Sequence, residues 1–126
     1  MAGNRAIYDR AMEQGREASR QARWDDALKG AVRALQEFPQ ELEARTLAAV
    51  ALFNTSRLSQ ALQILEELRA ADSSNPFYLD YIARAHEQQG NTAAAVQTYI
   101  ALADMQASRK LGAKTVEALR EVLRLR

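Results

Sequence analysis

The sequence of 126 residues has no cysteine, two prolines, five glycines and only 6% aromatic side chains. Without cysteine the chain can form neither a disulfide framework nor a thiol nucleophile. So few turn-forming and aromatic residues disfavour a β-sandwich or a barrel, whereas abundant alanine and leucine favour helices. The composition therefore indicates an all-α protein, at a length that suits one domain.

A charge excess of one sign and a long apolar run are missing as well. Seventeen Lys and Arg residues face sixteen Asp and Glu residues, a net charge of +1, so no global attraction to nucleic acid or anionic membranes is expected. No apolar run approaches the roughly 20 residues that span a bilayer. Arg5, Asp9 and Arg10 leave the N-terminus without the apolar core of a signal peptide. We therefore expect a cytoplasmic protein.

Three segments align without gaps at a spacing of 34 residues: 8–41, 42–75 and 76–109. Each segment has a small residue at its eighth place and alanine at its twentieth. Short side chains at these places let two helices of a hairpin cross closely. Because a unit this short cannot bury its own apolar face, the units must stack into one domain over residues 1–126. The recurring residues are Gly15, Ala49 and Ala83, then Ala27, Ala61 and Ala95.

Capping signals place the helix boundaries in the same register. Asn75 before Pro76 is typical of an N-cap followed by proline at the first helical position. Gly90 before Asn91 is typical of a helix end followed by the next N-cap. The sequence predicts helices over 5–21, 25–37, 41–53, 58–70, 76–89, 92–106 and 110–125.

This pattern resembles the tetratricopeptide repeat family, whose period is 34 and whose small residues stand at these places. The resemblance implies a right-handed superhelix of three antiparallel helical hairpins, with the first helix of each hairpin lining a concave groove. It also implies a non-enzymatic scaffold, without a cofactor, that binds a peptide or helix of a partner protein in that groove.

A seventh helix, residues 110–126, is predicted to cap the third unit. Val116, Leu119, Val122 and Leu123 form one apolar stripe at helical spacing, which should cover the end of the stack. Residues 108–126 carry six basic and two acidic side chains, a local charge of +4. Nucleic-acid binding through this basic helix is therefore kept as a minor alternative.

Catalytic and metal-binding patterns are absent from the sequence. The single histidine, His86, occupies a core-type place in the third unit, so we expect it to be satisfied by a neighbour. No His, Cys or carboxylate cluster surrounds it, and no glycine-rich phosphate loop is present. We expect no catalytic residue, no cofactor and no metal.

The resemblance assigns the groove to one face of the first helix of each hairpin. There, apolar residues stand where the core does not need them, and Arg16, Arg20 and Arg84 flank them. This arrangement suits a peptide with one large apolar residue and nearby acidic residues. The Asn54 side chain could pair with a backbone amide of that peptide. The predicted groove residues are Met12, Arg16, Arg20, Val50, Phe53, Asn54, Phe77 and Arg84.

One family arrangement and several alternatives complete the predictions. The family's clamp for a terminal carboxylate needs basic and amide residues at five places, where this chain has Met12, Arg16, Leu47, Phe77 and Tyr81. Only Arg16 is basic, so we expect no such clamp.

A homo-oligomeric assembly module remains an alternative function, although a monomer is favoured. Because the sequence ends inside a predicted helix, it is compatible with a piece of a longer protein.

Overall fold

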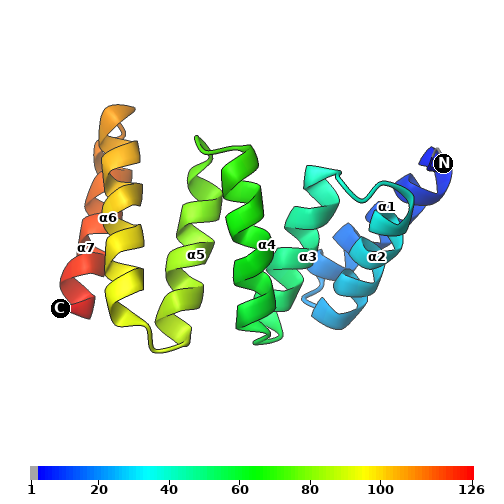
Figure 1. The fold of residues 1–126 in the computed structure, drawn as a ribbon, viewed down its shortest axis with the longest axis horizontal. Coiled ribbons are helices and arrows are strands. Elements are labelled where there is room, and N and C mark those ends of the chain that lie inside the picture. The colour runs from blue at the N-terminus through cyan, green and yellow to red at the C-terminus, as the bar shows by residue number, and fades with distance from the viewer. Residues whose placement is uncertain (1–2) are drawn as a thin grey trace. The chain divides into compact units, whose positions relative to one another are not determined.

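The computed structural model describes residues 3–126, which form seven α-helices and no strand. The helices are α1 (Arg5–Arg20), α2 (Trp24–Glu37), α3 (Leu42–Asn54), α4 (Leu58–Ala71), α5 (Pro76–Gln88), α6 (Thr92–Ser108) and α7 (Gly112–Leu125) (Figure 1). Every predicted helix is confirmed, with ends that differ by at most two residues. Within these residues, no helix has the length and apolarity that crossing a bilayer requires.

The chain divides into two compact units, Met1–Ile64 and Leu65–Arg126, with the boundary inside α4. In the first unit, α2 packs against both α1 and α3. In the second unit, α6 packs against both α5 and α7. Each unit therefore contains its own three-helix arrangement.

The small residues of the repeat are buried as predicted. Ala27, Ala61 and Ala95 are fully buried, and Gly15, Ala49 and Ala83 are buried at the other recurring place. The tightest crossing is between α1 and α2, where a Cβ on Gly30 would lie 2.7 Å from Gly15 Cα and 2.9 Å from the Ala11 carbonyl oxygen. The two backbones touch there, so neither helix has room for a larger residue. Trp24 packs nearby, against alanines of α1, α2 and α3.

The backbone repeats the 34-residue period in its turns. Ala22, Ser56 and Gly90 are spaced 34 apart, and all three adopt left-handed backbone angles, with φ of 56°, 62° and 80°. Each follows a helix, and the next residue donates its N–H to a carbonyl five residues back, as Arg23 does to Ala18. This is the hydrogen-bond pattern of a Schellman helix end. Only the third turn has glycine at the left-handed position.

The core of the second unit joins α5, α6 and α7. Leu79 and Ala83 of α5 pack with residues of α6 and with Ala118 and Val122 of α7. The predicted N-cap at Asn75 is confirmed, because its side chain accepts from the Phe77 N–H at 3.0 Å. Asn91 likewise accepts from the Ala94 N–H at 3.4 Å.

Two predictions about the second unit are wrong. The apolar stripe expected to bury α7 contributes only Val122, whereas Val116, Leu119 and Leu123 are exposed. The buried face turns instead toward Ala118, whose short side chain permits close packing. His86 is half-buried, but its Nδ1 has no hydrogen-bond partner among residues 3–126, so this nitrogen lacks the neighbour that the sequence predicts.

Candidate functional site

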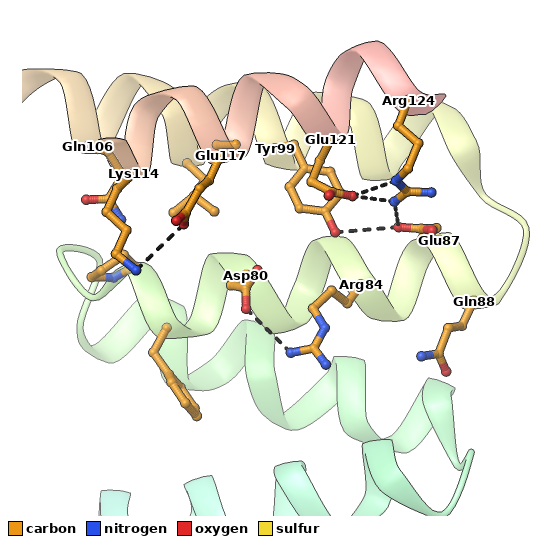
Figure 2. Close-up of a pocket in the computed structure, with 14 residues that line it drawn as sticks. Asp80, Arg84, Glu87, Gln88, Tyr99, Gln106, Lys114, Glu117, Glu121 and Arg124 are labelled. Atoms are coloured by element: carbon orange, nitrogen blue, oxygen red, sulfur yellow. Dashed lines mark hydrogen bonds and ion pairs between the residues drawn. The ribbon is translucent and has the colours of Figure 1, made fainter. Parts of the chain in front are cut away.

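A cleft of about 800 Å³ lies in the second unit, between α5 and α7, with α6 behind it (Figure 2). Pro76, Phe77, Asp80, Arg84, Glu87 and Gln88 form the α5 wall. Lys114, Glu117, Ala118, Glu121 and Arg124 form the α7 wall, and Tyr99, Leu102 and Gln106 belong to α6. On α5 the side chains recur every three or four residues, which places them on one helical face. The volume of the cleft is within the range of ligand pockets, about 300–1,000 Å³.

The α6 side of the cleft is mostly apolar but contains one unsatisfied polar atom. Tyr99, Leu102 and Gln106 are buried at helical spacing, and Ala118 meets them from α7. Gln106 is only 7% exposed, and its Oε1 has no hydrogen-bond partner within residues 3–126. A buried oxygen without a donor typically costs about 1–3 kcal/mol. Gln106 is thus the one buried polar residue in a surface that otherwise packs like a core.

Both walls carry charges that are paired within their own helix. Arg84 lies 3.5 Å from Asp80 on α5, and Lys114 lies 3.6 Å from Glu117 on α7. The Arg84 guanidinium also sits 4.7 Å from the centre of the Tyr81 ring. These charged groups are largely exposed, so the pairs contribute little to stability and can exchange partners at little cost.

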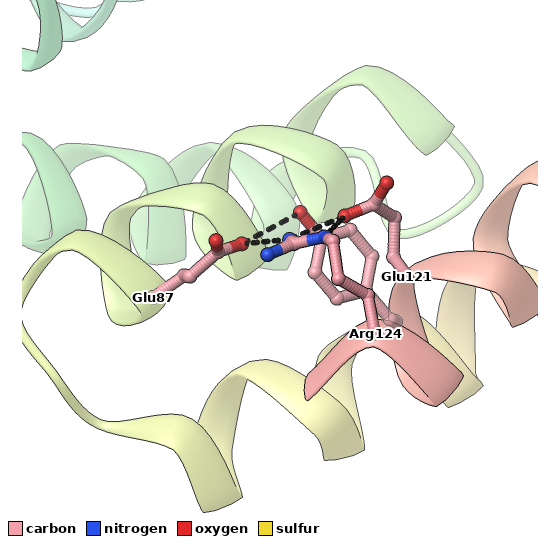
Figure 3. A network of polar contacts seen from close by, with 4 residues as sticks. Glu87, Glu121 and Arg124 are labelled. Atoms are coloured by element: carbon pink, nitrogen blue, oxygen red, sulfur yellow. Dashed lines mark hydrogen bonds and ion pairs between the residues drawn. The ribbon is translucent and has the colours of Figure 1, made fainter. Parts of the chain in front are cut away.

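At one end of the cleft a polar network joins the two walls. Arg124 of α7 donates to Glu87 of α5 at 2.7 Å and also pairs with Glu121 on its own helix (Figure 3). The Tyr99 hydroxyl completes the group by donating to Glu87 at 3.5 Å. The network therefore links all three helices of the cleft.

The network also shifts the ionisation of its members. The hydrogen bond from Arg124 lowers the pKa of Glu87, so this carboxylate stays charged at neutral pH. Burial raises the pKa of Tyr99 to about 12, helped by the negative charge of Glu87. Tyr99 therefore remains a neutral hydrogen-bond donor at any physiological pH.

Of the predicted groove residues in the second unit, Phe77 and Arg84 both line the cleft. Asp80, Glu87 and Gln88, which lie on the same face of α5, line it with them. Phe77 is 42% exposed, and its ring rests against that of Tyr81, with ring centroids 4.8 Å apart. A large apolar surface is therefore available on the α5 wall.

The predicted groove residues of α1 have different surroundings. Met12 is 1% exposed and packs with Tyr8, Ala11, Ala34 and Ala44, so the expectation that the core does not need it is wrong. The physical reason is that α1 contacts both α2 and α3, which widens its buried face.

Both α1 arginines already have acidic partners. Arg16 is exposed and pairs with Glu43 at 2.5 Å. Arg20 is also exposed and pairs with Glu17. A ligand acid at either place would have to compete with a carboxylate of this chain.

The predicted groove residues of α3 also differ from one another in exposure. Phe53 is 5% exposed, so it cannot present an open ring as expected, because its side chain is part of the protein interior. Val50 is half-buried. Asn54 is exposed, but its Nδ2 already donates to the Val50 carbonyl at 2.8 Å.

The sequence patterns did not predict four of the cleft residues, Tyr99, Gln106, Glu121 and Arg124. A signal for Gln106 exists, because Ala95, Tyr99, Leu102 and Gln106 follow one apolar stripe at spacings of four, three and four. A polar residue in that stripe marks a position where burial conflicts with hydrogen bonding. Residues 3–126 contain no group of three or more His, Asp or Glu side chains that could hold a metal ion.

Solved structures with the same fold are known. The TPR2B domain of yeast Sti1, in a complex with pHsp70, matches with a TM-score of 0.80 at 18% identity, covering 95% of this chain and 96% of that one. PcrH of Pseudomonas aeruginosa, in complex with the chaperone binding region of PopD, matches with a TM-score of 0.83 at 16% identity, covering 97% and 92%. At such identities the likeness establishes the fold, a stack of tetratricopeptide repeat hairpins.

Sequence comparison supplies the family. No curated protein matches the sequence significantly. The family model described as Tetratricopeptide repeat matches residues 12–76, which is just over half of the chain. The match begins inside α1, covers α2, α3 and α4, and ends at Pro76, the first residue of α5. The chain therefore belongs to the tetratricopeptide repeat family.

Proposed function

We propose that this chain is a non-enzymatic interaction module that binds a segment of a partner protein in the cleft between α5 and α7. One observation carries the proposal: the side chains on one face of α5 all line a single cleft of about 800 Å³, namely Phe77, Asp80, Arg84, Glu87 and Gln88. Such a volume accommodates a few side chains of a segment, not a whole folded domain.

The cleft chemistry defines the kind of segment. An apolar side chain of the ligand would pack on the exposed Phe77 ring and reach toward Leu102 and Ala118. Around it stand three basic and four acidic side chains, so the ligand should carry charges of both signs, not acids alone. Gln106 would accept a hydrogen bond from a ligand N–H once its amide turns toward the cleft.

Proteins with this fold support a protein partner. The yeast Sti1 domain and PcrH were each solved with a binding partner, pHsp70 in one case and a region of PopD in the other. For the present chain, we expect an internal segment and not a chain terminus, because Arg16 is the single basic residue at the five clamp places.

The proposal is tested by selecting peptides from a random phage-displayed library on the wild-type chain and measuring their affinity by calorimetry. Phe77→Ala should weaken binding by about 2 kcal/mol, as expected for a central aromatic anchor. Val32→Ser is the matched control, because Val32 is an exposed apolar residue on α2, in the other unit. Equal affinity for wild type and Phe77→Ala would reject the cleft as the binding site.

Two further measurements address the alternatives. Arg16→Glu extends the test to α1, and a large loss of affinity there would mean that the ligand also contacts the first unit. Solution mass by light scattering tests the assembly alternative. A dimer that dissociates when selected peptide is added would indicate that the cleft serves self-association.

A further inference from the structure

The outer face of α7 carries an apolar stripe that nothing in residues 3–126 covers. Val116, Leu119 and Leu123 are 47%, 44% and 71% exposed, and their spacing of three and four places them on one helical face. The buried face of the same helix is formed by Ala118 and Val122. Thus α7 has two apolar faces, of which only one is used to complete the second unit.

The exposed stripe leaves an apolar face of α7 open to solvent within the described residues. A contiguous apolar face on such a helix is typical of an interaction site. The stripe is separate from the cleft, because none of its three residues lines it.

The charges beside the stripe are all basic. Arg120 stands one turn from Val116, and Arg126 stands three residues after Leu123, so the two flank the stripe. Neither arginine forms an ion pair with any residue between 3 and 126. The two acids of α7, Glu117 and Glu121, line the cleft instead.

A second copy of this chain does not fit the surface. Two α7 helices packed face to face would place unpaired arginines against each other, which is unfavourable across an interface. A head-to-tail contact would need an apolar stripe on the outer face of α1. The exposed residues there are predominantly polar, including Asp9, Arg10, Glu13 and Gln14.

We infer that the outer face of α7 docks an amphipathic helix of a partner protein, whose apolar stripe is flanked by acidic residues. The partner's apolar residues would cover Val116, Leu119 and Leu123. Its acids would pair with Arg120 and Arg126. This surface is independent of the proposed cleft ligand.

The test uses two designed helical peptides of 14 residues, the length of α7. Both carry leucines at helical spacing, flanked by glutamates in one peptide and by lysines in the other, and binding is followed by fluorescence anisotropy. The glutamate peptide should bind at least about tenfold more tightly than the lysine peptide. Leu119→Ser should weaken it by about tenfold, while Val32→Ser and Phe77→Ala leave it unchanged.

A charge reversal provides a second test of the inference, which does not depend on the packing of apolar residues. Arg120→Glu combined with Arg126→Glu should reverse the preference toward the lysine peptide, and melting followed by circular dichroism verifies that the fold is kept. Equal binding of both peptides, or loss of binding in Phe77→Ala, would overturn the inference. So would a dimer that Leu119→Ser dissociates, or duplex DNA that displaces the glutamate peptide, since these indicate a second copy or a nucleic acid as the occupant.

Discussion

Replacing Ala22 with glycine should stabilise the protein, although glycine usually weakens helical proteins. Ala22 has a φ of 56° in the turn between α1 and α2, and its side chain is exposed. A left-handed residue with a Cβ costs about 1–2 kcal/mol. Glycine removes that cost but adds about 0.5–1 kcal/mol of backbone entropy in the unfolded chain. The net expectation is a gain of about 0.5–1 kcal/mol.

Gly90 provides the reverse experiment at the equivalent place of the third repeat. A Cβ built on Gly90 meets no atom within 4 Å, so Gly90→Ala changes the backbone term and no packing. It should therefore destabilise by about 0.5–1 kcal/mol. Ala22 and Gly90 stand at equivalent places, two repeats of 34 residues apart. The opposite effects of these two substitutions on stability are a direct consequence of the shared turn geometry.

Urea denaturation followed by circular dichroism measures both effects as shifts of the midpoint. Gln14→Gly is the control, because Gln14 is exposed in the middle of α1, where glycine should cost about 1 kcal/mol. If Ala22→Gly lowered the midpoint as Gln14→Gly does, the residue would not be left-handed and the turn would have been assigned wrongly.

Three further predictions concern the repeat core and the cleft. Gly30→Ala should destabilise by about 1–3 kcal/mol, since its Cβ would press against the Gly15 backbone; an unchanged urea midpoint would mean that α1 and α2 cross less closely. Ala61→Leu should cost about 1–3 kcal/mol by overpacking a fully buried place, whereas Ala93→Leu on the exposed face of α6 should cost almost nothing; equal midpoints would refute the repeat register. Tyr99 has a pKa of about 12 in the folded protein against an ordinary 10. Its contribution to the free energy of unfolding is therefore complete below pH 10 and is lost as pH rises toward 12. Urea midpoints at pH 8 and pH 11 should therefore differ less in Tyr99→Phe than in wild type, and an equal difference would contradict the raised pKa.

The sequence alone was sufficient for the helices and their register, because both depend on local patterns. Caps such as Asn75 and Asn91 satisfy backbone groups within three residues of themselves, so their meaning can be inferred without a structure. Buried small residues such as Ala61 recur at a fixed period that any alignment of the chain with itself reveals. The left-handed turns at Ala22 and Ser56 were not predictable, since neither residue favours that conformation.

The site was predicted only in part, because exposure depends on how a helix is rotated against its neighbours. Phe77 and Arg84 line the cleft, whereas Met12, which has the same helical periodicity, is buried by two neighbouring helices. The rotation of α7 was misjudged for the same reason, as several faces of that helix contain apolar residues. Gln106 lines the cleft because of the tertiary packing of α6, which no local sequence pattern specifies.

The bond between Glu87 and Arg124 has a consequence for how salt acts on this protein. It is an ion pair that ties the α5 wall to the α7 wall at one end of the cleft. Added salt screens this pair and so lowers the free energy needed to separate the walls. By thermodynamic linkage, a ligand that inserts an uncharged group between the two residues gains affinity as ionic strength rises. Most complexes held by charges show the reverse, so the sign of the salt dependence reports whether the ligand enters between the walls at this end of the cleft.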